Sequence, residues 1–359
     1  MSEPFAPSEV APSGCPKCGT ALAPNILSCP GCGRLVHADE LKRLADEAAA
    51  AIQPADGLRA WRKAYALLPE GSRQQAAVLR KIDDLVKVAE IAPFPTSART
   101  PAKSAKAAGA GGPKSLWSRI LGILGVSAVF IAKFKFAALF LLTKAKFLLL
   151  GLTKMGTLLS MAVSVGFYWT LWGWKFALGF VVSIYIHEMG HVAMLSRLGI
   201  HATAPMFIPG VGAIVRLREN LPTAREDARV GLAGPIWGLG AAVAAYALSL
   251  AFDSQMMLAI ATVGAWINLF NLTPVWQLDG SRAFRALTRT QRWIAVAVVA
   301  AALFASSVGI LWAVLLFAVM RAFQKDAAEE PDNVALGEYV FLIATLTILA
   351  WIPVKIPAR

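Results

Sequence analysis

Long apolar runs in the last two thirds of the chain constrain its fold more than any other feature. From about residue 116 onward the sequence is dominated by Leu, Val, Ala, Phe and Trp, in stretches long enough to cross a bilayer. Hydrophobic residues make up 57% of the 359 residues and charged residues only 16%, a balance that is too apolar for a soluble protein of this length. We therefore predict an all-α polytopic membrane protein with about six transmembrane helices.

Five of these runs are clear candidates for membrane spans. They cover residues 156–173, 175–197, 229–252, 256–275 and 336–354. Residues 293–323 are either one long tilted span or a tight pair around "SSVG". Between the second and third spans, "TAPMFIPGVGAIVRLRE" combines Pro and Gly with β-branched residues, which predicts a short membrane-associated β-hairpin. Non-helical backbone at this depth must be covered by protein or line a cavity, so we expect the hairpin to pair with an extended substrate.

The charge is distributed unevenly along the chain, whose formal net charge is +13. Eleven basic residues and no acidic residue lie between Glu90 and Glu188, and their neighbours are mainly Phe, Leu and Ile. This favours anionic lipid headgroups over nucleic acid as the partner of the basic region 115–155. That region is either an interfacial helix with lysines on one stripe or a full span, which leaves the total between about five and eight spans.

Basic residues also predict the orientation of the chain in the membrane. Arg197 and the cluster at Arg282, Arg285, Arg289 and Arg292 mark cytoplasmic ends of spans. The first residues contain no basic stretch followed by an apolar run, so we expect no signal peptide and a cytoplasmic N-terminal part. The location that fits these features is a bacterial-type inner, or cytoplasmic, membrane.

All four cysteines lie near the N-terminus, in "CPKCGTALAPNILSCPGC". Two Cys-x-x-Cys pairs, each followed by glycine, predict a closed structural zinc site with the ligands Cys15, Cys18, Cys29 and Cys32. Two disulfides in an exported domain are the alternative, which the expected cytoplasmic location disfavours. A segment this short has no core of its own, so the metal would supply its folding energy. We expect this zinc ribbon, residues 1–34, to be a docking module, either for a partner, which could be a protein or a nucleic acid, or for the chain's own membrane domain.

Between the ribbon and the membrane region lie a helical segment and a linker. Residues 35–91 carry apolar residues at three- and four-residue spacing, which predicts two or three soluble helices. They are either a plain helical hairpin or a single tetratricopeptide-like pair. Residues 92–114 are rich in Pro, Ala, Gly and Lys and are typical of a flexible linker.

One polar motif interrupts the second predicted span. In "HEMGH", His187 and His191 are four residues apart and so share one face of a helix, with Glu188 beside them. In the pattern His-Glu-x-x-His, the histidines bind zinc and the glutamate acts as general base. Two interior histidines that hydrogen-bond to other helices are the alternative. An unpaired carboxylate inside a span favours a functional site.

A catalytic zinc needs a third protein ligand and an open position for water. Asp279 is the outstanding candidate in the apolar half, because it ends a span within "FNLTPVWQLDGSR", after a proline break and before a glycine. Glu226 and Asp227 lie among arginines, and we expect them to be solvated charges.

These motifs together resemble the site-2 protease family of intramembrane zinc metalloproteases. The residues that carry the resemblance are His187, Glu188, His191, Asn271, Pro274, Leu278, Asp279 and Gly280, together with "AGP" at Ala233–Pro235. The resemblance covers about residues 156–290, so we expect the protease core at 156–292 and further transmembrane helices at 293–359. The family often has an asparagine shortly after the AGP, whereas this chain has Trp237 and Gly238 there. The chain has no PDZ-like or CBS-like stretch.

The resemblance implies an enzyme that hydrolyses peptide bonds within transmembrane segments. It implies that Asp279 is the third zinc ligand and that Asn271 and Pro274 line the site near the scissile carbonyl. It would use one catalytic zinc in addition to the structural one, and its substrates would be single-span membrane proteins. We expect the hairpin residues Phe207, Ile208, Gly210 and Gly212 to contact the unwound substrate.

Two other functions are compatible with parts of the sequence. A zinc transporter or sensor would use the histidines as a transit site, but few other ionisable residues lie within the spans. A catalytically inactive scaffold would use the zinc ribbon and helices to hold partners, but the intact Glu188 argues against it.

Overall fold

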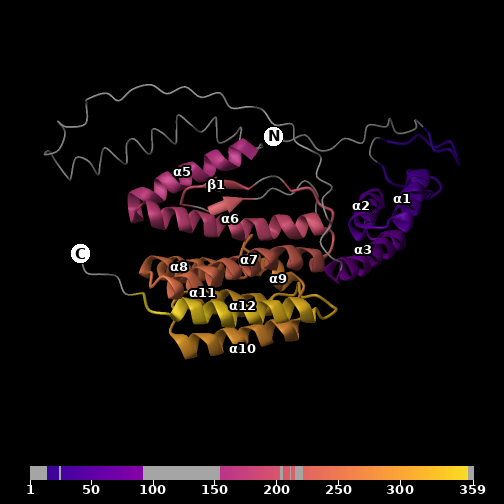
Figure 1. The fold of residues 1–359 in the computed structure, drawn as a ribbon. Helices are drawn as coiled ribbons and strands as arrows, with labels where there is room; N and C mark the ends of the chain where they lie inside the picture. The colour runs from indigo at the N-terminus through magenta and orange to yellow at the C-terminus, as the bar shows by residue number, and fades with distance from the viewer. Residues whose placement is uncertain are drawn as a thin grey trace, which may run out of the picture.

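The computed structural model describes residues 14–23, 26–91, 154–202, 205–210, 212–214 and 221–354. The linker predicted at 92–114 and all but the end of the basic region predicted at 115–155 lie outside these residues. Within them the protein is mostly helical, with one small two-stranded sheet (Figure 1).

Three helices follow the cysteine segment near the N-terminus: α1 (Ala38–Ala50), α2 (Pro54–Ala66) and α3 (Arg73–Ile91). Each has one apolar stripe, and the three stripes meet in a small core around the buried side chains of Leu44, Leu58 and Ile82. The prediction of two or three helices in residues 35–91 is confirmed, and the number is three.

The apolar half of the chain forms a stack of helices. Their bounds are α5 (Lys154–Trp172), α6 (Trp174–Arg197), α7 (Ala224–Ala251), α8 (Gln255–Asn271), α9 (Asp279–Arg285), α10 (Arg289–Ser306), α11 (Ile310–Phe323) and α12 (Asn333–Trp351). Helix α6 packs between α5 and α7, α7 packs on α8 and α9, and α12 lies between α8 and α10 (Figure 1).

Three helices of the described chain are long and apolar enough to cross a membrane: α6, α7 and α12. The protein is therefore a membrane protein, whereas the predicted total of about six spans remains a prediction. Residues 293–323 form a pair of helices, because the chain breaks between α10 and α11 at Ser307, which has a left-handed φ of 58°. The alternative of one long tilted span in this region is wrong.

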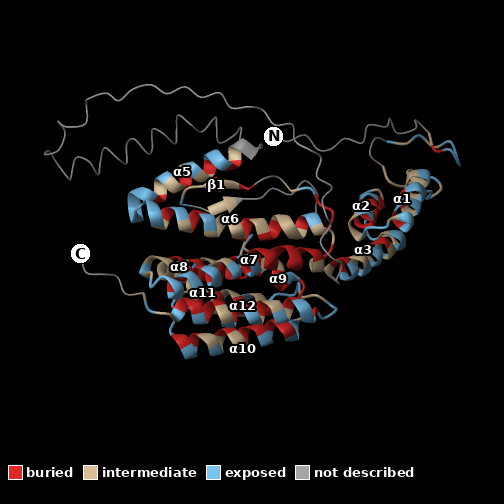
Figure 2. Cartoon of the chain, viewed as in Figure 1, coloured by how far each residue is buried: buried red, intermediate tan, exposed pale blue. Residues whose placement is uncertain are grey.

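Burial is concentrated in α7, which lies at the centre of the stack (Figure 2). Its inner face joins a core formed with α8 to α12, including Leu232, Leu269, Leu311 and Leu342, each with no exposed side-chain surface. Large apolar side chains on the outward surfaces of α11 and α12, such as Trp312, Phe341 and Trp351, are exposed, as expected of surfaces that face lipid.

The predicted hairpin is confirmed between α6 and α7. Strands β1 (Met206–Ile208) and β2 (Gly212–Ile214) pair antiparallel, with Phe207 opposite Ala213. Helix α5 lies along β1, where the Thr157 hydroxyl donates to the Pro205 carbonyl and the Phe207 amide donates to Ser160 Oγ. The Gly210 amide donates to the Tyr168 hydroxyl. Side chains of α5 therefore hold the outer edge of β1.

Candidate metal centre

The two histidines of α6 face the interior, one helical turn apart. His187 and His191 are 4% and 7% exposed, and their Nε2 atoms are 3.2 Å apart. Their rings are nearly perpendicular, so the two Nε2 atoms converge while the Nδ1 atoms point to different neighbours.

Asp279 completes the group from another helix. It is the first residue of α9 and is buried, and its carboxylate oxygens lie 3.2 Å from His187 Nε2 and 3.4 Å from His191 Nε2. Helix α9 is anchored to α7, because the Asp227 carboxylate accepts hydrogen bonds from Arg282 at 2.7 Å and from Arg285 at 2.8 Å. Residues 187, 191 and 279 thus meet only because α6, α7 and α9 pack together.

Both histidines are oriented through their Nδ1 atoms. His191 Nδ1 lies 2.7 Å from the Val230 carbonyl oxygen of α7, which can only accept a hydrogen bond. His187 Nδ1 lies 2.9 Å from Oδ1 of Asn268, whose Nδ2 donates to the Gly264 carbonyl in α8. These acceptors require a proton on each Nδ1 in the neutral rings and leave both Nε2 lone pairs directed at the shared centre.

The glycines of α7 make room for this arrangement. A Cβ atom on Gly234 would lie 2.8 Å from His187 Nε2 and still closer to the His191 ring. A Cβ atom on Gly238 would collide with the Asn268 carboxamide. Gly238 occupies the region where an asparagine was expected by resemblance, and in this chain an asparagine of α8 fills the space beside it.

Three more predicted residues lie at or near this centre. Glu188 is 8% exposed, and one carboxylate oxygen lies within 4.8 Å of ligand atoms of His187 and His191. Asn271 is the last residue of α8, and its Nδ2 lies 3.3 Å from His187 Nε2. Pro274 is buried in the bend between α8 and α9, three residues after Asn271.

The spacing of the donor atoms suits a zinc ion. Two ligand atoms at ~2.0–2.1 Å from a tetrahedral metal are about 3.3 Å apart. The separations between the two Nε2 atoms and the Asp279 oxygens are 3.2–3.4 Å. Two neutral imidazoles and one carboxylate are also a donor set that zinc uses in catalytic sites.

Comparison with known proteins covers part of this site, namely both histidines and Glu188 but not Asp279. Residues 175–255, which include both histidines, Glu188, the hairpin and the AGP, match Peptidase family M50. Because of this similarity, residues 175–255 are called the M50 domain below.

Two curated zinc metalloproteases are similar to the chain over part of its length. Zinc metalloprotease MJ0392 of Methanocaldococcus jannaschii is 27% identical over 121 residues, which cover 32% of this chain and 34% of that protein. Probable zinc metalloprotease EGY2, chloroplastic, of Arabidopsis thaliana is 26% identical over 221 residues, which cover 46% of this chain and 40% of that protein. The chain thus spans well under half of the length of these relatives. No solved structure gives a significant match.

A second group of possible metal ligands lies outside the M50 match. The sulfur atoms of Cys15 and Cys32 are 3.7 Å apart and those of Cys18 and Cys29 are 3.5 Å apart, close to the ~3.8 Å between two thiolates on a tetrahedral zinc. Each Cys-x-x-Cys pair closes a matching turn, in which the Gly19 amide donates to the Cys15 carbonyl and the Gly33 amide to the Cys29 carbonyl. Both glycines have a positive φ, of 72° and 71°, as such turns require.

The pKa values within the cysteine group shift in opposite directions, since burial and the neighbouring cysteines raise the pKa of Cys32 to about 11. Hydrogen bonds from the Thr20 hydroxyl and the Thr20 backbone lower the pKa of Cys18 to about 6. A thiol with a lowered pKa is more often in the thiolate form that binds a metal ion.

The hairpin of β1 and β2 differs from the sequence prediction in the environment of one residue, Phe207. The Phe207 side chain is only 1% exposed and stacks near Tyr185 of α6, and its amide is bound by Ser160. Phe207 therefore anchors the hairpin. Ile208 is half-buried, Gly210 lies in the turn and Gly212 begins β2.

Sequence reasoning missed two residues that orient the histidines and misjudged two others. Asn268 carried a detectable signal, because it is an amide in an apolar helix and precedes Asn271 by three residues, on the same face. The role of the Val230 carbonyl could not be predicted from the sequence, because every residue has a backbone carbonyl. The expectation that Glu226 and Asp227 are solvated is wrong: they are 0% and 6% exposed, because each pairs with arginines from other helices.

Proposed function

We propose that this chain is an intramembrane zinc metalloprotease that hydrolyses peptide bonds within transmembrane segments of membrane-protein substrates. The observation that carries the proposal is the convergence of His187 Nε2, His191 Nε2 and the Asp279 carboxylate, with both Nδ1 atoms already engaged. His187, His191 and Asp279 would hold the catalytic zinc, and Cys15, Cys18, Cys29 and Cys32 would hold a structural one.

The residues around the centre have distinct roles in this proposal. A zinc ion there would polarise the scissile carbonyl and lower the pKa of a coordinated water towards neutrality. Glu188 would accept the proton of the attacking water and deliver it to the amide nitrogen that leaves. Its burial keeps bulk water from competing for that proton. Asn271 would donate a hydrogen bond from Nδ2 to the substrate carbonyl. Pro274 would fix the bend that places both Asn271 and Asp279 at the metal centre.

The substrate would be unwound before cleavage, because a helical peptide bond is shielded by its own hydrogen bonding. We propose that its extended backbone pairs with β2 rather than with β1, whose outer edge is held by α5. Since the Phe207 amide is bound by Ser160, the Phe207–Ala213 pair exchanges no ladder hydrogen bonds, and the Ala213 amide and carbonyl point to the outer edge of β2. Strand β2 also lies against α6, which carries the histidines.

An Ala213→Pro substitution tests the role of β2. Proline removes the outward amide but no hydrogen bond between the two strands, so cleavage should fall about tenfold or more while the zinc content is unchanged. Wild-type cleavage by this variant would exclude pairing at β2. Zinc content is measured by elemental mass spectrometry.

The orientation of the chain follows from its charges. Arg197, Arg282 and Arg285 lie at the end of the stack that contacts α1–α3, so we propose that this end and the N-terminal part are cytoplasmic. A bacterial-type inner membrane, single-span substrates and regulated cleavage fit this orientation. The zinc ribbon would offer a docking site for a protein partner.

The decisive experiment compares the wild-type protein with a Glu188→Gln variant. The variant keeps the zinc ligands but lacks the proton acceptor, so it should retain the wild-type zinc content and lose proteolysis by about a thousandfold or more. New protein N-termini within predicted spans are identified by mass spectrometry in membranes that contain either form. If both forms generate the same termini, the chain is not a protease of this mechanism, and a transporter or scaffold role becomes the better hypothesis.

A further inference from the structure

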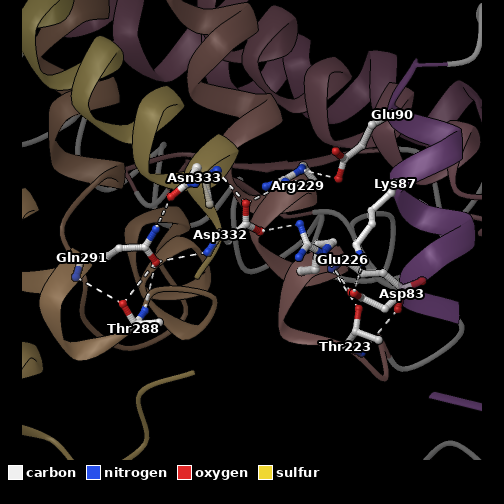
Figure 3. Close-up of polar contacts among 12 residues, drawn as sticks. Asp83, Lys87, Glu90, Thr223, Glu226, Arg229, Thr288, Gln291, Asp332 and Asn333 are labelled. Carbon is white, nitrogen blue, oxygen red and sulfur yellow. Dashed lines mark hydrogen bonds and ion pairs between the residues drawn. The ribbon is translucent and has the colours of Figure 1, made fainter. Parts of the chain in front are cut away.

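The first two turns of α7 concentrate buried charge. Arg225, Glu226, Asp227 and Arg229 all lie within six residues, and Glu226 and Arg229 are 0% and 2% exposed. Burying charge is costly unless each group is paired. Asp227 is paired with α9, whereas the other three make contacts with the N-terminal helices α2 and α3. Figure 3 shows the contact between Arg229 and Glu90 of α3.

These contacts bridge the N-terminal helices and the M50 domain. Arg62 of α2 binds Glu226 and also donates to the Leu198 carbonyl, at the end of α6. Arg225 donates to Asp83 of α3 at 2.9 Å, and Arg229 donates to Glu90 of α3 at 2.6 Å. Asp332, which caps α12, accepts a second bond from Arg229, so this guanidinium lies between α3 and α12 (Figure 3).

The last turn of α3 is held from α6 as well. Arg197, at the end of α6, donates to the carbonyl oxygens of Ala89 and Glu90 at 2.7 and 2.6 Å. The final carbonyls of a helix have no partner within that helix and carry partial negative charge, so a guanidinium is well suited to them.

Apolar contacts show that the docking is more than a set of surface ion pairs. Leu195, Leu198 and Ile200, at the end of α6 and just beyond it, share a hydrophobic core with the side chains of α1–α3. Val230 of α7 belongs to the same core and has no exposed surface. The N-terminal helices and the M50 domain are therefore packed as one body at this end of the stack (Figure 1).

Val230 connects this interface to the metal centre. Its side chain lies in the core shared with the N-terminal helices, while its carbonyl oxygen lies 2.7 Å from His191 Nδ1. Arg229, the preceding residue, is held by Glu90 of α3. A displacement of α3 would thus act on the peptide unit that orients His191.

We propose that the N-terminal helices are a positioning element of the metal centre, in which Glu90 holds Arg229 and thereby keeps the Val230 carbonyl aligned with His191. The proposal rests on the proposed zinc site at His187, His191 and Asp279. It assigns Glu90 and Arg229 as positioning residues, which act on the site without touching substrate or metal. A partner that pulls α3 away from α7 would loosen the site.

The test measures how fast the full-length protein loses zinc to a chelator such as EDTA, with a Glu90→Ala variant compared with an Asp84→Ala control. Asp84 is on the same helix, but it is exposed and pairs only with Lys87 in the described part of the chain. Mutation of the hydrogen-bond partners of metal-binding histidines lowers metal affinity by about 10–100-fold, so we expect Glu90→Ala to lose zinc about tenfold faster than the wild type. Asp84→Ala should match the wild type.

Two further variants make the outcome unambiguous. Zinc retained by a His191→Ala variant belongs to the cysteine site and is subtracted. Glu90→Gln keeps the shape of the side chain and a neutral acceptor for Arg229, so it should lose zinc faster than the wild type but more slowly than Glu90→Ala. Its melting temperature should be unchanged, which separates positioning from partial unfolding. Wild-type rates in both Glu90 variants would overturn the proposal. If the wild type holds no more zinc than His191→Ala, the proposed catalytic site is wrong instead.

Discussion

The two candidate metal sites of this chain are built in opposite ways. The four cysteines lie between residues 15 and 32, in two turns closed by local backbone hydrogen bonds, and Cys18 is exposed. The histidine site takes donors from residues 187, 191 and 279, and all of them are buried. One site is specified by local sequence and the other by the packing of α6, α7, α8 and α9. Changes to helix packing should therefore affect only the second.

The largest effect on the histidine site is expected from Gly234→Ala. The new Cβ would occupy the space between the two Nε2 atoms, so this zinc should be lost while the cysteine-bound zinc stays. Helix propensity alone predicts that this substitution stabilises α7, since alanine is favoured over glycine by ~1 kcal/mol within a helix. Gly240→Ala on the same helix is the control, because its Cβ would meet no atom within 4 Å. Retention of both zinc ions in Gly234→Ala, measured by elemental mass spectrometry, would contradict the geometry of the site.

A smaller effect is expected from Asn268→Ala. It removes the acceptor that orients His187, so the affinity of the histidine site for zinc should fall about 10–100-fold without loss of the fold. Competition with a chelator of known affinity measures the change. Asn268→Asp, which keeps an oxygen acceptor, should retain more of the affinity than alanine does. Equal affinity in all three proteins would show that Asn268 has no part in orienting His187.

The smallest effect on the histidine site is expected from Cys29→Ser. Removal of one of four thiolates should release zinc from the proposed cysteine site and unfold the segment around it, because the metal would supply the folding energy of so short a segment. Loss of zinc from the histidine site should remain at the wild-type rate, since α1–α3 have their own core around Leu58 and Ile82. Faster loss from the histidine site would show that the two sites are coupled and are not specified independently.

Sequence patterns predicted much of this arrangement because they act locally. Two histidines four residues apart must share a helix face, and Pro and Gly with β-branched residues favoured the hairpin that the structure contains. Asp279 was singled out as a carboxylate at the end of an apolar run, and it lies beside both histidines. The misjudged residues are those whose environment comes from distant segments. Glu226 looks solvated among its neighbours, but Arg62, 164 residues away in sequence, buries and neutralises it.

The sequence by itself determined the class of the protein, the two sets of possible ligands and the helix that carries the histidines. These follow from composition, from residue type and from spacing along one helix. Only the tertiary structure decided which atoms orient those ligands: the Asn268 carboxamide, the Val230 carbonyl and, behind it, the contact between Glu90 and Arg229. The physical reason is that a hydrogen bond depends on the distance between two atoms, and for segments far apart in sequence only helix packing sets that distance.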